Sequence, residues 1–138
     1  GSKARSSGVV GNINLFDEVL QRPEIKDYGE TVNAIGSTAA SQAIDLSLGN
    51  VVTATMAQST TTFSISNPSA SGKCCSFTLI LTQDGSGSRA VAWPASVKWP
   101  GDTAPTISTG ADKVDILSFI TVDAGTNWYG FEGGIDLR

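Results

Sequence analysis

The sequence predicts an all-β protein: an antiparallel β-sandwich, jelly-roll-like, with a short N-terminal arm or helix. Three observations support this class. Short runs alternate apolar and polar residues at the period of a half-buried strand, turn residues separate these runs at regular spacing, and no long helical pattern occurs. About eight short strands are expected, which suits two packed sheets.

The clearest strand patterns lie in the middle of the chain. Residues 43–48 (AIDLSL) and 60–66 (TTTFSIS) each alternate so that one face is buried. Gly49-Asn50 is a turn pair, and residues 51–57 are expected to run back from it. The loop DGSGS, residues 84–88, is predicted to close a hairpin.

Two further strands are apolar on both faces, residues 74–83 (CCSFTLILTQ) and 113–122 (KVDILSFITV). A lone two-sheet sandwich needs only one apolar face per strand. The surplus therefore predicts a covering surface, which we expect another copy of the chain to provide.

The N-terminal part is expected to be an arm, residues 1–22, ahead of a β-sandwich domain, residues 23–138. Its first residues are small, polar and basic, a composition typical of disorder, and Gly1-Ser2 is typical of a cloning scar. Whether the chain is a fragment stays open. Residues 12–22 could form one short helix capped by Asn14, with an assembly face made of Leu15, Phe16, Val19 and Leu20.

Composition argues against catalysis. The chain has no histidine, which removes the usual general base, histidine-dependent nucleophiles and most zinc sites. The remaining carboxylate pairs, Asp112 with Asp115 and Asp123 with Glu132, lie beside turns where acidic residues are ordinary. The oxygen-rich loop 123–127 lacks the further ligands of a calcium site. We therefore predict no enzyme, no metal and no cofactor.

The charge and hydropathy of the chain argue against nucleic-acid and membrane partners, and its cysteines bear on where it is made. The formal net charge is −4 and basic residues are scattered, so no nucleic-acid footprint is expected. No apolar run approaches the roughly 20 residues that span a bilayer, and no membrane insertion is expected. The adjacent Cys74 and Cys75 should point to opposite faces of a strand without forming a disulfide, which favours a reducing place of synthesis.

The stretch WPASVKWPG, residues 93–101, carries two of the three tryptophans. Exposed tryptophans can stack on sugar rings, so the candidate binding residues are Trp93, Lys98, Trp99 and Tyr129. We expect Trp99 to be the most exposed of the aromatic residues. The alternative, that these rings pack in the core, is favoured for Trp93 and Trp128.

Several stretches together resemble a module of tailed-phage virion proteins that recurs near the C-termini of tail-fibre and other structural chains. They are IDLSLGNVV, TTFSISNPSASG, SFTLILTQDGSG, VAWPASVKWPGDTAPTIS and VDILSFITVDAGTNWYGF. The resemblance covers about residues 24 to 131. Its matching positions are Trp93, Pro94, Val97, Lys98, Trp99, Pro100, Gly101, Asp115, Ile116, Leu117, Trp128, Tyr129, Gly130 and Phe131.

This resemblance implies a non-enzymatic structural protein of the virion, made in the cytoplasm of the bacterial host. We expect a homotrimer whose further partners are other capsid or tail proteins. A tail-fibre domain, a capsid-decoration module of the head-fibre or cement kind, and a passive trimerisation module stay open. The alternative is a lectin-like module that recognises a host surface glycan.

Overall fold

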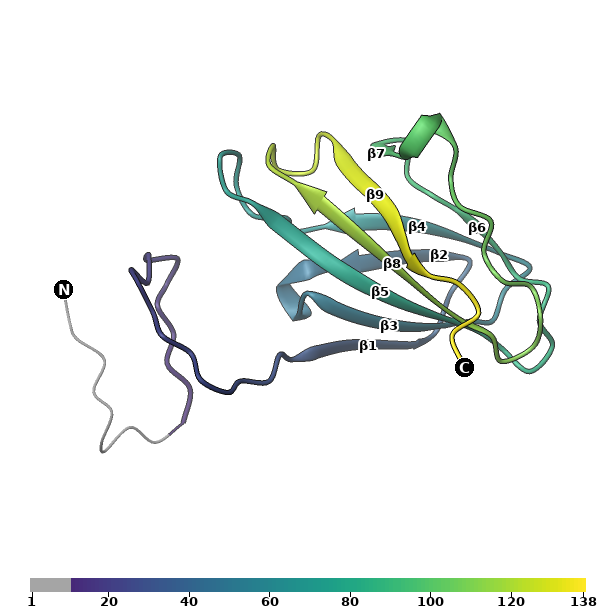
Figure 1. Cartoon of the computed structure of the whole chain (residues 1–138), viewed down its shortest axis with the longest axis horizontal. Coiled ribbons are helices and arrows are strands. Elements are labelled where there is room, and N and C mark those ends of the chain that lie inside the picture. The colour runs from purple at the N-terminus through teal and green to yellow at the C-terminus, as the bar shows by residue number, and fades with distance from the viewer. Residues whose placement is uncertain (1–10) are drawn as a thin grey trace.

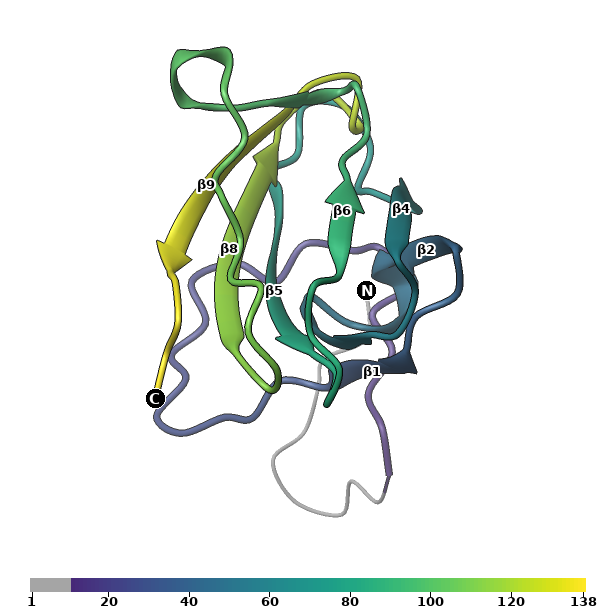
Figure 2. The same cartoon turned by 90° about the vertical axis from the view of Figure 1, so that its right-hand side faces the viewer.

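Two β-sheets pack face to face in the computed structural model, which describes residues 11–138 (Figures 1 and 2). The expectations about disorder and a cloning scar in the first ten residues lie outside the described residues. The larger sheet has the strand order β1-β3-β5-β8-β9-β7 and the smaller sheet the order β2-β4-β6. The strands are β1 (Val32–Ser37), β2 (Ser41–Asp45), β3 (Val51–Met56), β4 (Thr60–Ser66), β5 (Cys75–Gln83), β6 (Ala90–Ala92), β7 (Val97–Lys98), β8 (Val114–Thr121) and β9 (Trp128–Gly134). The all-β sandwich class is confirmed.

The direction of strand pairing corrects the expectation of an antiparallel, jelly-roll-like sandwich. Strands β1, β3 and β5 are parallel in the larger sheet, and β2, β4 and β6 are parallel in the smaller one. The chain thus crosses from one sheet to the other after each of these strands. Only β5–β8 and β8–β9 pair antiparallel, while the short β7 runs parallel to β9. The sandwich is therefore mixed. From β1 to β6 the chain winds alternately between two sheets of parallel strands.

Two predicted turns consequently have another role. Gly49-Asn50 and the loop 84–88 do not close hairpins, because each connects strands of different sheets. The expected strand 43–48 also ends early, at Asp45. Its carboxylate accepts a hydrogen bond from the Ser47 backbone N–H at 3.0 Å, and Leu46–Leu48 form a 3-10 helix instead.

The core consists of inward rows that stand in register across the larger sheet. Val52 pairs with Leu79, and Leu79 with Leu117, and all three are 0 % exposed. Phe77 and Phe119 form a neighbouring pair with ring centroids 4.7 Å apart. Since side chains alternate along a strand, this inward row fixes which residues face outward.

The arm contains no helix over residues 12–22, which corrects that alternative. Asn14 Oδ1 accepts a hydrogen bond from Phe16 N at 2.8 Å, and Leu15 O accepts one from Glu18 N at 2.9 Å. Phe16 and Asp17 then adopt positive φ, so the structure ends after one turn. A helix this short is marginal unless it packs on something, and residues 11–31 are all exposed.

A buried glutamine joins the loops at the end of β5. Gln83 is 2 % exposed, and its Nε2 donates to Arg89 O at 2.9 Å and to Ser108 O at 2.7 Å. Its Oε1 accepts from Arg89 N at 2.9 Å. These bonds tie the loop after β5 and the loop before β8 to the core.

Replacing Gln83 by Met should lower the free energy of unfolding by about 2–4 kcal/mol, because it leaves three partly buried backbone groups without their side-chain partner. Urea denaturation followed by tryptophan fluorescence measures this change. The control is Gln58→Met, an exposed position that loses one long hydrogen bond, from Nε2 to Thr38 O at 3.4 Å, and it should change stability by less than about 1 kcal/mol. Equal effects at the two positions would contradict the role given to Gln83.

Candidate functional site

The two tryptophans of the Trp-Pro stretch lie in an aromatic cluster between the sheets. Trp93 stacks on Phe63, with centroids 5.8 Å apart and 21° between the planes, and meets Trp99 edge-on at 5.3 Å. Both indoles lie 5.6 Å from the ring of Phe119. Both are partly buried against the core, so packing occupies a face of Trp93 that a sugar would need.

Gly130 on β9 makes room for this cluster. A Cβ atom at that position would lie 2.7 Å from Trp99 Cζ3 and 2.9 Å from Val97 Cγ1. Trp99 can therefore cross β9 only because residue 130 has no side chain. The expectation that Trp99 would be the most exposed aromatic residue is wrong for this reason, since Tyr129 is 54 % exposed and Trp99 is partly buried.

The four candidate binding residues do not meet in one place. Trp93 and Trp99 belong to the inner cluster, whereas Lys98 and Tyr129 are exposed. Lys98 and Tyr129 are register partners on β7 and β9, which places them side by side on the outer side of the sheet. Glycan binding by these residues stays a prediction.

The candidate carboxylates hold loops in place. Asp115 is 3 % exposed and accepts hydrogen bonds from Ser108 N and Ser108 Oγ, both at 2.7 Å, and from Asp136 N at 2.9 Å. Asp123 accepts bonds from the backbone and side chain of Asn127 and from Thr121 Oγ1, each at 2.9 Å. Both carboxylates are thus engaged by neighbouring loop groups, while Asp112 and Glu132 are exposed.

Hydrogen bonds also lower the pKa of two loop carboxylates. The pKa of Asp123 lies below its ordinary value of 3.8, mainly because Asn127 donates its backbone N–H and its side-chain amide. The pKa of Asp84 is lowered chiefly by the hydrogen-bonded guanidinium of Arg89, 2.7 Å away. The ionised form of each carboxylate therefore stabilises the folded state.

Other reactive groups are sparse in the part of the chain that the structure describes. Cys74, just before β5, is exposed, and Cys75, the first residue of β5, is buried; neither forms a disulfide. Within residues 11–138, no three His, Cys, Asp or Glu side chains lie close enough to hold a metal ion. In the same range, no helix is long and apolar enough to cross a membrane.

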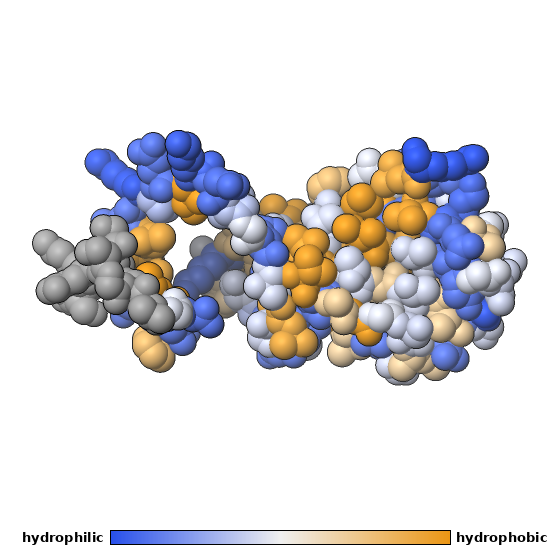
Figure 3. All heavy atoms as spheres, turned by 90° about the horizontal axis from the view of Figure 1, so that it is seen from below, coloured by the Kyte–Doolittle hydropathy of each residue, from blue (hydrophilic) through white to orange (hydrophobic). Residues whose placement is uncertain are grey.

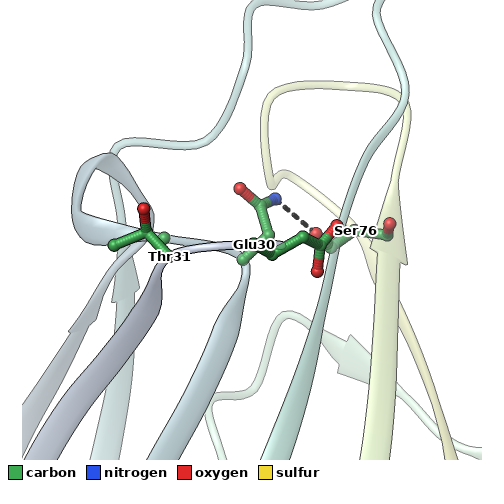
Figure 4. Close-up of a pocket in the computed structure, with 5 residues that line it drawn as sticks. Glu30, Thr31 and Ser76 are labelled. Carbon is green, nitrogen blue, oxygen red and sulfur yellow. Dashed lines mark hydrogen bonds between the residues drawn. The ribbon is translucent and has the colours of Figure 1, made fainter. Parts of the chain in front are cut away.

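A small polar hollow opens where β1, β3 and β5 begin (Figure 4). It is lined by Glu30, Thr31, Gly49, Asn50 and Ser76, and Asn50 Nδ2 donates a hydrogen bond to Ser76 O. The lining contains one carboxylate and no second titratable group, so it offers no acid–base pair.

The outer side of the larger sheet carries a broad surface without charged residues. We call it the outer face and define it by the outward positions of β1, β3, β5 and β8. None of these positions carries a charge, and most hold β-branched residues: Val32, Ala34, Ser37, Val51, Thr53, Thr55, Ser76, Thr78, Ile80, Thr82, Val114, Ile116, Ser118 and Ile120. The sequence indicated its centre through the two-faced strands 74–83 and 113–122, but not its continuation onto β1 and β3.

Fold and surface together define a β-module whose polar residues secure loops and whose distinctive feature is an uncharged sheet face. A family model described as "Putative phage tail fibre C-terminal domain" matches residues 37–128, which is most of the chain. The protein belongs to this family and is a virion-associated structural module. A search of curated proteins and a search of solved structures each returned no match.

Replacing Gly130 by Ala should destabilise the fold by about 1–3 kcal/mol, because the added Cβ overlaps Trp99 and Val97. Thermal or urea unfolding measures the loss, and displaced Trp99 should shift the tryptophan emission of the folded protein. The control is Gly85→Ala, where a Cβ meets nothing within 4 Å. An unchanged Gly130→Ala protein would contradict the packing described for the cluster.

Stability should fall in acid. Because the pKa of Asp123 is lower in the folded chain than its ordinary 3.8, its contribution is complete above about pH 5 and is lost as the pH drops below 3.8. We expect the urea midpoint to fall between pH 7 and pH 3, and to fall less in the Asp123→Asn variant. An identical pH dependence in the two proteins would contradict this assignment.

Proposed function

We propose that the chain is a non-enzymatic module of a phage tail fibre that assembles as a homotrimer through its outer face. The family supports the tail-fibre role. The uncharged rows of β3, β5 and β8 are the observation that carries self-association. The threefold state is our inference from the resemblance to fibre modules.

An uncharged face suits contact between identical chains. Residues close to a threefold axis lie near their own copies, so a charge at such a position would face like charges. Threonine and isoleucine avoid this repulsion, and charged residues are generally depleted at interface centres. Ile80 and Ile116 are directly paired across β5 and β8 and are still half-buried in the single chain. Covering the remainder of each would contribute roughly 1 kcal/mol.

The outward face of the smaller sheet provides a contrast. It consists mainly of exposed serine, alanine and threonine side chains, among them Ala43, Thr62 and Ser64. These residues offer little apolar area, so this side of the sandwich has a weak drive to associate. We therefore assign the subunit contact to the larger sheet.

Glycan recognition is a second candidate, favoured by one observation: Lys98 and Tyr129 lie side by side and exposed. A phenol ring beside a cation can stack on and hydrogen-bond a sugar. A change in fluorescence or in NMR shifts on adding host polysaccharide, lost in Tyr129→Ala, would support this role. It is compatible with a trimeric fibre.

Light scattering tests the assembly. The full chain should have three times the 14.3 kDa mass of one chain, and Ile80→Lys should reduce it to a single chain, because it places a cation in the contact. Thr62→Lys, on the outward face of the smaller sheet, is the matched control and should remain trimeric. A full chain that stays monomeric at high micromolar concentration would overturn the proposal.

A further inference from the structure

We infer that residues 13–28 of one copy lie across the outer face of a neighbouring copy, so that the subunits of the assembly exchange arms. This inference rests on the proposed self-association and names a segment that covers the part of the outer face around one hollow. It is argued from the apolar residues of the arm, a hollow on the outer face, the charges around both, and the reach of the chain.

The arm exposes more apolar surface than a free segment in water should. Phe16 is 80 % exposed, and the arm stands away from the sandwich in the space-filling view, with apolar side chains on both (Figure 3). Exposed apolar clusters of this kind mark interaction sites. The seven large apolar side chains are Ile13, Leu15, Phe16, Val19, Leu20, Ile25 and Tyr28.

The outer face offers a receiving site. Near the beginning of β5 and the end of β8 lies a shallow hollow, which is lined by Ser76, Phe77, Thr78, Ser118, Phe119, Ile120 and Phe131. Phe131, 47 % exposed, forms one wall. The lining carries no charge, so an apolar side chain such as that of Phe16 can enter without desolvating an ion.

Charges around the two surfaces are complementary. Residues 11–31 contain five carboxylates, Asp17, Glu18, Glu24, Asp27 and Glu30, against two cations, Arg22 and Lys26. Two exposed lysines lie at the end of the sheet that holds the hollow. Lys73 precedes β5, and Lys98 is the register partner of Tyr129 at the start of β9. Both lysines would attract the acidic side chains of an arm whose apolar side chains lie on the sheet.

The arm is long enough to reach a neighbour. It joins the sandwich at Val32, in the transverse row that continues through Val51, Thr78 and Ser118 to Phe131. Four strand spacings put Val32 about 19 Å from that wall of the hollow. Fifteen extended residues span up to about 50 Å, enough to pass from one subunit to the next.

Within its own chain the arm runs away from the sheet (Figure 1). Asp17 does line a polar hollow with Asn67 and Lys73 of the loop before β5, but this leaves Phe16 uncovered. The apolar side chains of the arm thus find no cover in the described part of their own chain. The outer face of a second copy is the surface that we infer covers them.

Disulfide cross-linking between different molecules tests the exchange. In a Cys74→Ser background, isotope-labelled Asp17→Cys chains are mixed with unlabelled Ser118→Cys chains, allowed to exchange subunits and oxidised. We expect a cross-linked peptide pair with one labelled half, identified by mass spectrometry. Ser64→Cys, exposed on the smaller sheet, replaces Ser118→Cys in the control and should give no such pair.

A second measurement separates this inference from the proposed function. Removing residues 1–22 should turn the trimer into a monomer, and Phe16→Ser should weaken association roughly tenfold or more. A truncated chain that stays trimeric, without the labelled cross-link in the full chain, overturns the arm exchange and leaves self-association intact. A full chain that is already monomeric overturns both.

Discussion

The structure depends on the register of the inward rows across the larger sheet. Val52, Leu79 and Leu117 stand side by side on three strands and are fully buried. A shift of one residue would turn each row to solvent, so the core permits only this pairing. The same register turns Thr78, Ile80 and Ile116 outward together. The packing of the core therefore determines which residues form the uncharged outer face.

Aromatic packing and buried hydrogen bonds stabilise the loops around these rows. Aromatic rings around Phe119 fill the space that the short β7 and the Trp-Pro stretch enclose, and Gly130 admits them. Buried polar groups do the same for the loops: Gln83 and Asp115 satisfy backbone groups that would otherwise be orphaned. These residues are engaged inside the sandwich. Our proposals therefore concern exposed parts of residues 11–138: the outer face, the arm and the pair Lys98 and Tyr129.

The sequence predicted the strands well but not their partners. Alternation in residues 60–66 reproduced β4, since that pattern reflects which side chains are buried, and the two-faced runs 74–83 and 113–122 contain β5 and β8. The same pattern says nothing about pairing direction, and Gly49-Asn50 makes an equally good turn between two sheets as within one. The predicted helix over 12–22 failed because its capping bond at Asn14 closes one turn with no surface beneath it. The exposure of Trp99 depended on a contact with Gly130 from a distant strand, which no local pattern contains.

The proposed assembly requires that the outer face is covered when the chains associate. Hydroxyl-radical footprinting at protein concentrations above and below the dissociation midpoint tests it most directly, because it reports the solvent exposure of individual side chains. We expect Ile80 and Ile116 to be labelled in the dilute protein and protected in the concentrated one, while Leu48, 58 % exposed in the 3-10 helix after β2, is labelled equally in both. Equal labelling of the two isoleucines at all concentrations, with a mass that nevertheless rises, would show that the chains associate through another surface.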